Sequence, residues 1–138
     1  LIHLPNRPAV KACGIIDFQD AGTGPVTYDL ASLLQDARWT VPYQLAADCL
    51  TTYARAFPGM DRNTFDISYA VMAAQRHVRV IAVFHRLAEQ GKPDYLVHMP
   101  HLWRLLVAMF AHPALEDVAA WFEAHLPTAV QIRMHGGQ

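Results

Sequence analysis

The spacing of apolar and polar residues predicts a short β-hairpin that leads into a mostly helical body. Residues 1–4 and 12–16 are short apolar runs of the kind that form strands. The sequence Pro-Asn-Arg-Pro at residues 5–8 favours a turn between them, because proline fixes φ and asparagine tolerates a left-handed backbone. Pro25 is then expected at the first position of a helix, where its missing N–H costs nothing.

The segment after Pro25 and the next segment along the chain carry apolar residues at helical spacing, which predicts two helices that each bury one face. Pro58 and Gly59 are expected to end the second of these helices. The expected buried faces are formed by Leu30, Leu33, Leu34 and Ala37 in the first helix, and by Leu45, Cys49, Tyr53 and Phe57 in the second.

The longest helix is expected over residues 63–90. Asn63 is its expected N-cap, Asp66 falls in the first turn, and Gly91 is expected to end it. Two apolar stripes run along this segment, so we expect a central helix that is packed from both sides. The first stripe comprises Ile67, Val71, Ala74, Val78 and Ile81, and the second comprises Phe65, Tyr69, Met72, Val80, Phe84 and Leu87.

A fourth helix is expected from Pro100, a break at His112 and Pro113, and a last helix that reaches Leu126. The predicted fold class is therefore α+β, mostly α, with a short hairpin followed by about five helices. Residues 1–126 are expected to form one domain or part of one, and residues 127–138 to be a disordered tail.

Composition narrows the class of protein. The chain has 138 residues, of which 53% are hydrophobic and 17% charged, as expected of a packed domain. A net charge of -1 argues against nucleic-acid binding, and every apolar run is interrupted before the ~20 residues of a membrane span. Cys13 and Cys49 have no metal-site spacing, so reduced cytoplasmic thiols are expected. Because residue 1 is not Met and falls in an expected strand, we expect a larger protein to contain this chain.

Asp17 is the main candidate for chemistry. It follows an apolar run, and Gly14 before it allows another backbone or a ligand to approach closely. Mg²⁺ prefers hard oxygen ligands and accepts one or two carboxylates beside phosphate and water. A carboxylate at a strand tip suits that task, although an ordinary turn residue fits the same spacing.

Residues 14–34, Gly-Ile-Ile-Asp-Phe-Gln-Asp-Ala-Gly-Thr-Gly-Pro-Val-Thr-Tyr-Asp-Leu-Ala-Ser-Leu-Leu, resemble the metal-binding loop and following helix of the aminoglycoside phosphotransferase and choline kinase-like superfamily. Residues 75–87, with Gly-Lys at 91–92 and Tyr-Leu at 95–96, are similar to its bacterial anomeric N-acetylmuramate and N-acetylglucosamine kinases. The resemblance implies that residues 1–126 are part of a protein kinase-like C-terminal lobe. It also implies ATP and Mg²⁺ as cofactors and, in cell-wall recycling, phosphorylation of the anomeric hydroxyl of an amino sugar.

Carried onto this sequence, the resemblance gives Asp17 the role of the Mg²⁺-binding aspartate at the catalytic centre. Asp29 matches a position that supports the fold by tying the first helix to the catalytic loop. Gln19 and Asp20 lie close enough to Asp17 in sequence to face substrate or a second metal ion.

Two more residues are candidates for substrate contact. Arg76 interrupts an apolar stripe, so it is expected either to pair with an acid such as Asp29 or Asp36 or to bind the carboxylate of a muramic acid substrate. Trp39 is expected either to form a wall against a sugar ring or to pack in the core, as are Tyr43 and Tyr53. The eight His are expected at the surface or at helix ends rather than around a metal ion.

The chain departs from the family in one respect: it contains no His-x-Asp followed by an Asn five residues after the Asp. The N-terminal lobe that clamps the nucleotide is the expected partner of this segment. Because positioning supplies most of the catalysis of phosphoryl transfer, we expect the 138-residue chain alone to be inactive. The alternatives are a phosphotransferase for aminoglycosides or amino-alcohols, and a non-catalytic helical module that binds another protein.

Overall fold

The computed structural model describes residues 1–16, 19 and 21–126. A two-stranded antiparallel hairpin opens the chain, with β1 at Ile2–His3 and β2 at Cys13–Gly14, as predicted but with shorter strands. Ile2 lies opposite Gly14, and a Cβ on that glycine would stand only 2.7 Å from the Ile2 Cγ2 atom. The glycine is therefore needed for this close approach between the two strands. A 3₁₀-helix, η1 at Ala9–Ala12, completes the loop between the strands.

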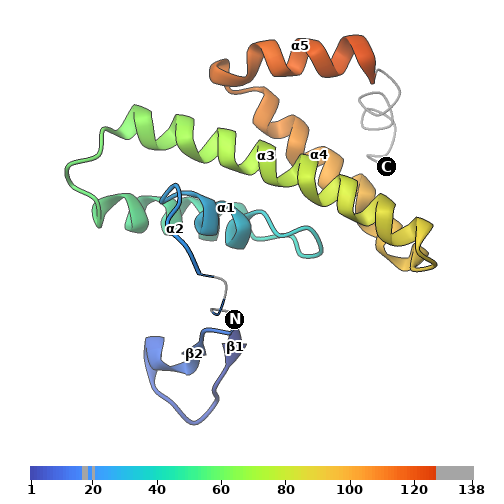
Figure 1. The fold of residues 1–138 in the computed structure, drawn as a ribbon. Helices are drawn as coiled ribbons and strands as arrows, with labels where there is room; N and C mark the ends of the chain where they lie inside the picture. Colours follow the sequence, from blue (N-terminus) through green and yellow to red (C-terminus); the bar gives the residue numbers. More distant parts are fainter. Residues whose placement is uncertain (17–18, 20, 127–138) are drawn as a thin grey trace.

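The helices follow in the predicted order. They are α1 (Tyr28–Leu34), α2 (Tyr43–Arg55), α3 (Arg62–Glu89), α4 (Met99–Phe110) and α5 (Glu116–His125), with short 3₁₀-helices η2 (Pro93–His98) and η3 (Pro113–Leu115) on either side of α4. Figure 1 shows α3 crossing the molecule, with α1 and α2 on one side and α4 and α5 on the other. The predicted mostly helical α+β class and the central position of the longest helix are confirmed.

Helix α1 begins at Tyr28 and not, as predicted, at Pro25. The carbonyl of Pro25 instead accepts a hydrogen bond from the Tyr28 amide at 3.0 Å, so this proline opens a turn. Thr27 is the N-cap and is fully buried, and its Oγ1 lies 2.7 Å from the Ser68 Oγ of α3. A contact across 41 residues thus sets the start of the helix, which local turn chemistry does not reveal.

Helix α3 begins one residue earlier than predicted and is capped by Asp61 rather than Asn63. The Asp61 Oδ2 accepts hydrogen bonds from the Thr64 backbone N–H at 2.9 Å and from its hydroxyl at 3.2 Å. Aspartate and asparagine are equally good N-caps, so composition alone did not separate the two positions. The predicted end at Gly91 is confirmed, since Gly91 has a φ of 85°, a backbone conformation that favours glycine.

The core consists of two hydrophobic clusters along α3. The first is formed by Ala37, Ala70, Ala74, Ile81, Phe84, Leu102, Leu106, Leu115 and Phe122, and the second by Leu30, Leu34 and Phe65. The prediction of two apolar stripes that are both packed against other elements is wrong in part, because Val78 is 39% exposed. Leu33 and Leu45, expected to be buried, are also exposed. Cys13 and Cys49 are both free thiols.

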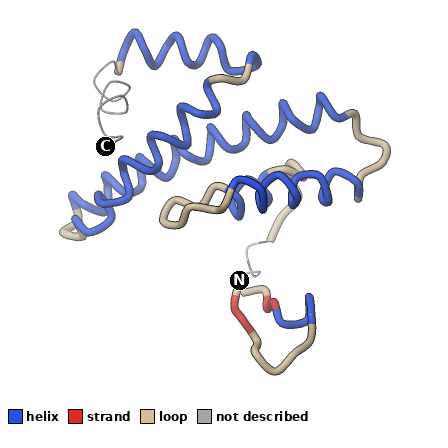
Figure 2. The backbone as a smooth tube through the Cα atoms, turned by 180° about the vertical axis from the view of Figure 1, so that it is seen from behind, coloured by secondary structure: helices blue, strands red, loops and turns tan. Residues whose placement is uncertain are grey.

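Figure 2 shows the hairpin lying apart from the helices. Within residues 1–16, 19 and 21–126, no helix alone combines the length and apolar composition that a membrane crossing requires. Pro93–Phe110 and Pro113–His125, bent by 111° at their junction, meet both requirements only as a pair.

Candidate functional site

A cavity of about 960 Å³ lies between the segment that follows β2 and helix α1. Ile16 and Ala21, which flank residues 17–20 in the sequence, both line it, whereas Gln19 between them does not. Asp17 and Asp20 themselves lie outside the described residues. The residues on either side of the segment in which the sequence predicts a magnesium ligand therefore border this cavity.

The other wall of the cavity is one face of α1 and the residues just after it. Asp29, Ser32, Leu33 and Asp36 line the cavity at i, i+3, i+4 and i+7 spacing. The opposite face of the helix carries Leu30, Ala31 and Leu34, which are buried in the body of the molecule. The amphipathic pattern of α1 thus turns its polar side toward the cavity. Leu33, predicted to be buried, lies on that polar side, which is why it is 51% exposed.

The charged groups that the described residues contribute to the cavity lining are both carboxylates, Asp29 and Asp36. Asp36 is half-buried, and its Oδ1 accepts hydrogen bonds from the backbone N–H groups of Arg38 at 2.7 Å and Trp39 at 3.1 Å. Asp29 is exposed and has no hydrogen-bond partner among the described residues, so its predicted supporting role stays a prediction. Although the Arg38 Nε lies 3.9 Å from the Asp36 Oδ1, the two carboxylates give the cavity lining an acidic character that favours cations.

Both ends of α1 are held by hydrogen bonds to other helices. Before its first turn, the Tyr53 hydroxyl of α2 donates to the Val26 carbonyl at 2.7 Å, and Thr27 contacts Ser68. After its last turn, the carbonyl of Gln35 accepts from the Arg76 Nη1 at 3.3 Å, and the carbonyl of Asp36 lies 3.1 Å from the His101 Nε2. These bonds hold α1 in place. We call the face formed by Asp29, Ser32 and Leu33 of this helix, together with Asp36 just after it, the acidic wall of the cavity.

The Gln35 side chain is the centre of a buried polar cluster. Its Oε1 accepts a hydrogen bond from the His77 Nε2 at 2.6 Å, and its Nε2 donates to the Tyr69 hydroxyl at 3.1 Å and to the Met109 sulfur at 3.3 Å. Burial raises the pKa of the Tyr69 hydroxyl, which therefore stays neutral near pH 7. We call Gln35, Tyr69, His77 and Met109 the Gln35 cluster.

His77 is fully buried, which contradicts the prediction that the histidines lie at the surface or at helix ends. Burial, reinforced by the nearby charges of Arg76 and His101, lowers the pKa of His77 to about 4, so the imidazole is neutral at pH 7. A signal for this position existed in the sequence. His77 continues the series Ala70, Ala74 and Ile81 at helical spacing, which is the buried face of α3.

Arg76 and Trp39 do not line the cavity in the described structure. Arg76 is half-buried and forms no ion pair with Asp29 or Asp36 among the described residues, because its guanidinium donates to a backbone carbonyl instead. Trp39 and Tyr43 are 69% and 87% exposed, so the core-packing alternative is wrong for both. They sit beyond the end of α1, in a loop and at the first residue of α2, where little covers them.

Tyr53 does line the cavity and is half-buried, while Gln19 is exposed and outside the lining. The substrate roles of Trp39, Arg76 and Gln19 stay predictions. Among the residues that the structure describes, no three His, Cys, Asp or Glu side chains gather as a metal-ligand set.

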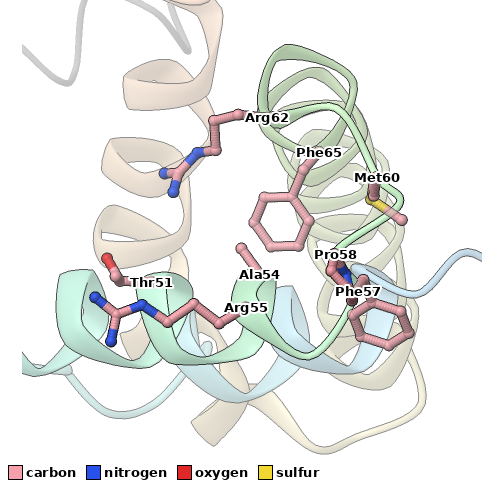
Figure 3. Close-up of a pocket in the computed structure, with 8 residues that line it drawn as sticks. All are labelled: Thr51, Ala54, Arg55, Phe57, Pro58, Met60, Arg62 and Phe65. Atoms are coloured by element: carbon pink, nitrogen blue, oxygen red, sulfur yellow. The ribbon is translucent and has the colours of Figure 1, made fainter.

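A second, smaller pocket of about 260 Å³ lies between α2 and the start of α3. Figure 3 shows the side chains of Arg55 and Arg62 reaching to the same side of it, with the Phe65 ring between the helices. Arg62 pairs with Asp66 at 2.9 Å, and its guanidinium carbon lies 5.8 Å from the centre of the Phe65 ring. This pocket contains none of the residues singled out from the sequence for chemistry.

Comparison with known proteins gives the same picture. Residues 9–65 match a family described as the phosphotransferase enzyme family, and this range includes most of the cavity. The chain is 41% identical over 128 residues to an N-acetylmuramate/N-acetylglucosamine kinase from Caulobacter vibrioides, covering 92% of this chain and 35% of that protein.

Proteins of the same name from Pseudomonas aeruginosa and Neisseria meningitidis are 34% and 37% identical, over 76% and 67% of this chain. The chain spans about a third of the length of these relatives, 33% and 30% for the latter two. The resemblance indicated by the motifs is confirmed: over most of its length the chain is a relative of N-acetylmuramate/N-acetylglucosamine kinases, and residues 9–65 carry the match to the phosphotransferase enzyme family.

Proposed function

We propose that this chain is the magnesium- and substrate-binding part of an ATP-dependent kinase that phosphorylates the anomeric hydroxyl of an amino sugar. The observation that supports the proposal is the acidic cavity of about 960 Å³ at the segment around Asp17, within residues that match the phosphotransferase family. The amino-sugar acceptor is suggested by the names of the relatives. Reuse of cell-wall sugars is the process in which we place the reaction.

The donor groups around the cavity suit a magnesium–nucleotide complex. Carboxylate oxygen is the ligand that Mg²⁺ prefers, and Asp29 and Asp36 make the lining acidic. In our proposal Asp17 binds the cation, while Gln19 and Asp20 face substrate or a second ion. When bound, Mg²⁺ neutralises charge that develops on the transferred phosphoryl group. The chain's own contribution is to hold the carboxylates and the acceptor in fixed positions.

The reaction needs groups beyond those of this sequence. A base beside the acceptor hydroxyl and a cation on the phosphates are part of the usual phosphoryl-transfer site, and no His-x-Asp occurs within the 138 residues. We therefore propose that the remaining part of a kinase, including a nucleotide-clamping lobe, is the partner of this chain. The 138 residues alone are expected to show no turnover.

The test is a chimera in which this chain replaces the matching 35% of the Caulobacter vibrioides relative. We expect ATP-dependent phosphorylation of N-acetylmuramate or N-acetylglucosamine, and a loss of about a hundredfold or more in kcat for Asp17→Asn, because positioning and charge stabilisation supply most of the rate. Asp117→Asn, the same change at an exposed site on α5 outside the cavity, is the matched control and should leave kcat within about twofold.

A folded chimera that keeps its activity after Asp17→Asn would contradict the role of Asp17. A folded chimera without any kinase activity would favour the alternative of a non-catalytic helical module. Folding is checked in each case by near-ultraviolet circular dichroism, which reports fixed side-chain packing, in comparison with the spectrum of the Caulobacter vibrioides relative.

A second candidate function has one observation in its favour. Because Asp29 and Asp36 supply the charge of the cavity lining that the structure describes, a cationic acceptor such as an aminoglycoside or amino-alcohol also fits. The Arg and His side chains of α3 would disfavour a cationic acceptor, but they do not line the cavity. Comparing kcat/KM of the chimera for an anionic, a neutral and a cationic acceptor separates the two functions.

A further inference from the structure

The Gln35 cluster joins the end of α1 to α3 and α4. Gln35 is the C-cap of α1, Tyr69 and His77 lie on α3, and Met109 lies on α4. The Gln35 side chain uses its oxygen for one bond to α3 and its nitrogen for bonds to α3 and α4. A single side chain therefore ties together the three helices that meet at this point.

Helix α1 depends on such ties because it is short. It has seven residues, far below the length at which an isolated helix is stable in water. Burial of Leu30 and Leu34 stabilises the helix against the body of the molecule, but it does little to fix the orientation of the helix, because apolar contacts are not directional. The hydrogen bonds of Gln35 are directional, so they fix the rotation of the helix and the depth at which its polar face meets the cavity.

We propose that Gln35 and His77 are positioning residues, which hold the acidic wall of the cavity in place through the end of α1. The geometry that supports this is the adjacency of Gln35 to Asp36. One residue is fixed in the buried cluster, and the next lines the cavity. The proposal rests on the proposed function only in its assumption that the cavity receives a magnesium–nucleotide complex.

The protonation state of His77 decides whether the cluster can form. Because Nε2 donates to Gln35 Oε1, the neutral imidazole carries a lone pair on Nδ1, and this buried atom has no hydrogen-bond partner within the described residues. Protonation would create a buried N–H without an acceptor. It would also add a charge beside Arg76 on α3 and His101 on α4. Tyr69, the other titratable group of the cluster, stays neutral.

Amide hydrogen exchange of the full chain tests the positioning directly. We expect Gln35→Ala to lower the protection factors of Ala31 and Leu34 by about tenfold or more, because it leaves the buried His77 N–H without a partner. The amides of Leu102 and Leu106 in α4 should change far less. Ile81→Val, which removes one buried methyl group elsewhere on α3, is the matched control and should not act selectively on α1.

A pH series provides a readout that a merely structural role would not change. In the unmodified chain, protection of α1 relative to α4 should fall as the pH is lowered from 6.5 toward 4. In His77→Gln, which keeps an N–H donor but cannot take up a proton, this selective fall should disappear. A uniform loss of protection over all helices, or an unchanged pH series in His77→Gln, would overturn the proposal.

Binding separates this inference from the proposed function. Mn²⁺ with an ATP analogue is titrated while line broadening is followed at Ser32 and Leu33 on the cavity wall. If the unmodified chain binds, Gln35→Ala should weaken the affinity several-fold, and equal affinity would overturn the positioning role. If the unmodified chain shows no broadening, the titration is repeated with the chimera. Absence of broadening there would contradict the magnesium site of the proposed function, and the exchange experiment then decides the positioning role alone.

Discussion

At the scale of single residues, His77 illustrates what can and what cannot be predicted from the sequence. Its spacing places it on the buried face of α3, yet its partner Gln35 is 42 residues away and on another helix. Local periodicity reports which face of a helix is buried, but it contains no information on which distant side chain will meet it. Asp36 is a similar case, because its contact with the cavity depends on how α1 lies against α3.

The first prediction concerns the pH dependence of stability. The pKa of His77 is about 4 in the folded chain against 6.5 when exposed, so the unfolded chain binds more protons between these values. The contribution of His77 to the free energy of unfolding is therefore fully present above pH 6.5. It is lost as the pH falls toward 4, which lowers the free energy of unfolding by up to about 3 kcal/mol.

Urea unfolding at pH 7 and at pH 5 measures this change in the free energy of unfolding. The decrease should be larger in the unmodified chain than in His77→Gln, which has no proton to gain at this position. Equal decreases in the two proteins would show that other groups cause the acid sensitivity.

The second prediction concerns Tyr53, whose hydroxyl donates to the Val26 carbonyl at 2.7 Å. Tyr53→Phe should lower the free energy of unfolding by about 1 kcal/mol, because it removes this bond and keeps the ring. Tyr43→Phe is the matched control, since Tyr43 is 87% exposed and its change should be near zero. Denaturant unfolding of both variants provides the comparison. Equal effects would contradict a stabilising role for the hydrogen bond between Tyr53 and Val26.

At the scale of elements, the sequence predicted the helices well because their signals are local. The breaks at Pro58, Gly91 and Pro113, together with the apolar spacing, located each helix to within a few residues. The start of α1 was predicted wrongly because the residues from Pro25 to Tyr28 form a turn whose geometry is set by a buried contact of Thr27. The exposed face of α1 was missed for a related reason: the cavity that it borders is formed by a separate segment of the chain.

The third prediction distinguishes the observed cap of α3 from the expected one. Asp61→Ala should lower the free energy of unfolding by about 1 kcal/mol, because the Thr64 N–H would lose its acceptor. Asn63→Ala should have a much smaller effect, since Asn63 lies inside the first turn, is exposed and forms no side-chain capping bond among the described residues. Thermal unfolding of the two variants measures the difference, and a larger effect at Asn63 would contradict the assigned cap.

At the scale of the whole molecule, the hairpin and the segment after it expose large apolar side chains. Leu1, Ile2, Val10, Ile15 and Ile16 are all at least half exposed. A soluble chain seldom leaves so much apolar surface open without a partner. The sequence predicted the hairpin from its turn residues, but its separation from the helices could not be inferred from local patterns.

The fourth prediction follows from this surface. We expect the isolated chain to self-associate, and we expect Val10→Lys to shift the population toward the monomer in sedimentation velocity experiments. Val10 is 84% exposed, so the substitution should leave the fold intact. Val97→Lys, at a 74% exposed site on η2, tests whether an added positive charge anywhere has the same effect. Equal shifts in the two variants would exclude the hairpin as the associating surface.

The separation of the core into two clusters along one 28-residue helix has a consequence for cooperativity. One cluster holds α1 and α2 to the first turns of α3, and the other holds α4 and α5 to its later turns. Two packing units that share a helix can melt at different temperatures, so the calorimetric enthalpy of this chain should exceed the van't Hoff enthalpy. Residues that bridge the units would then govern how nearly the whole chain unfolds in one step.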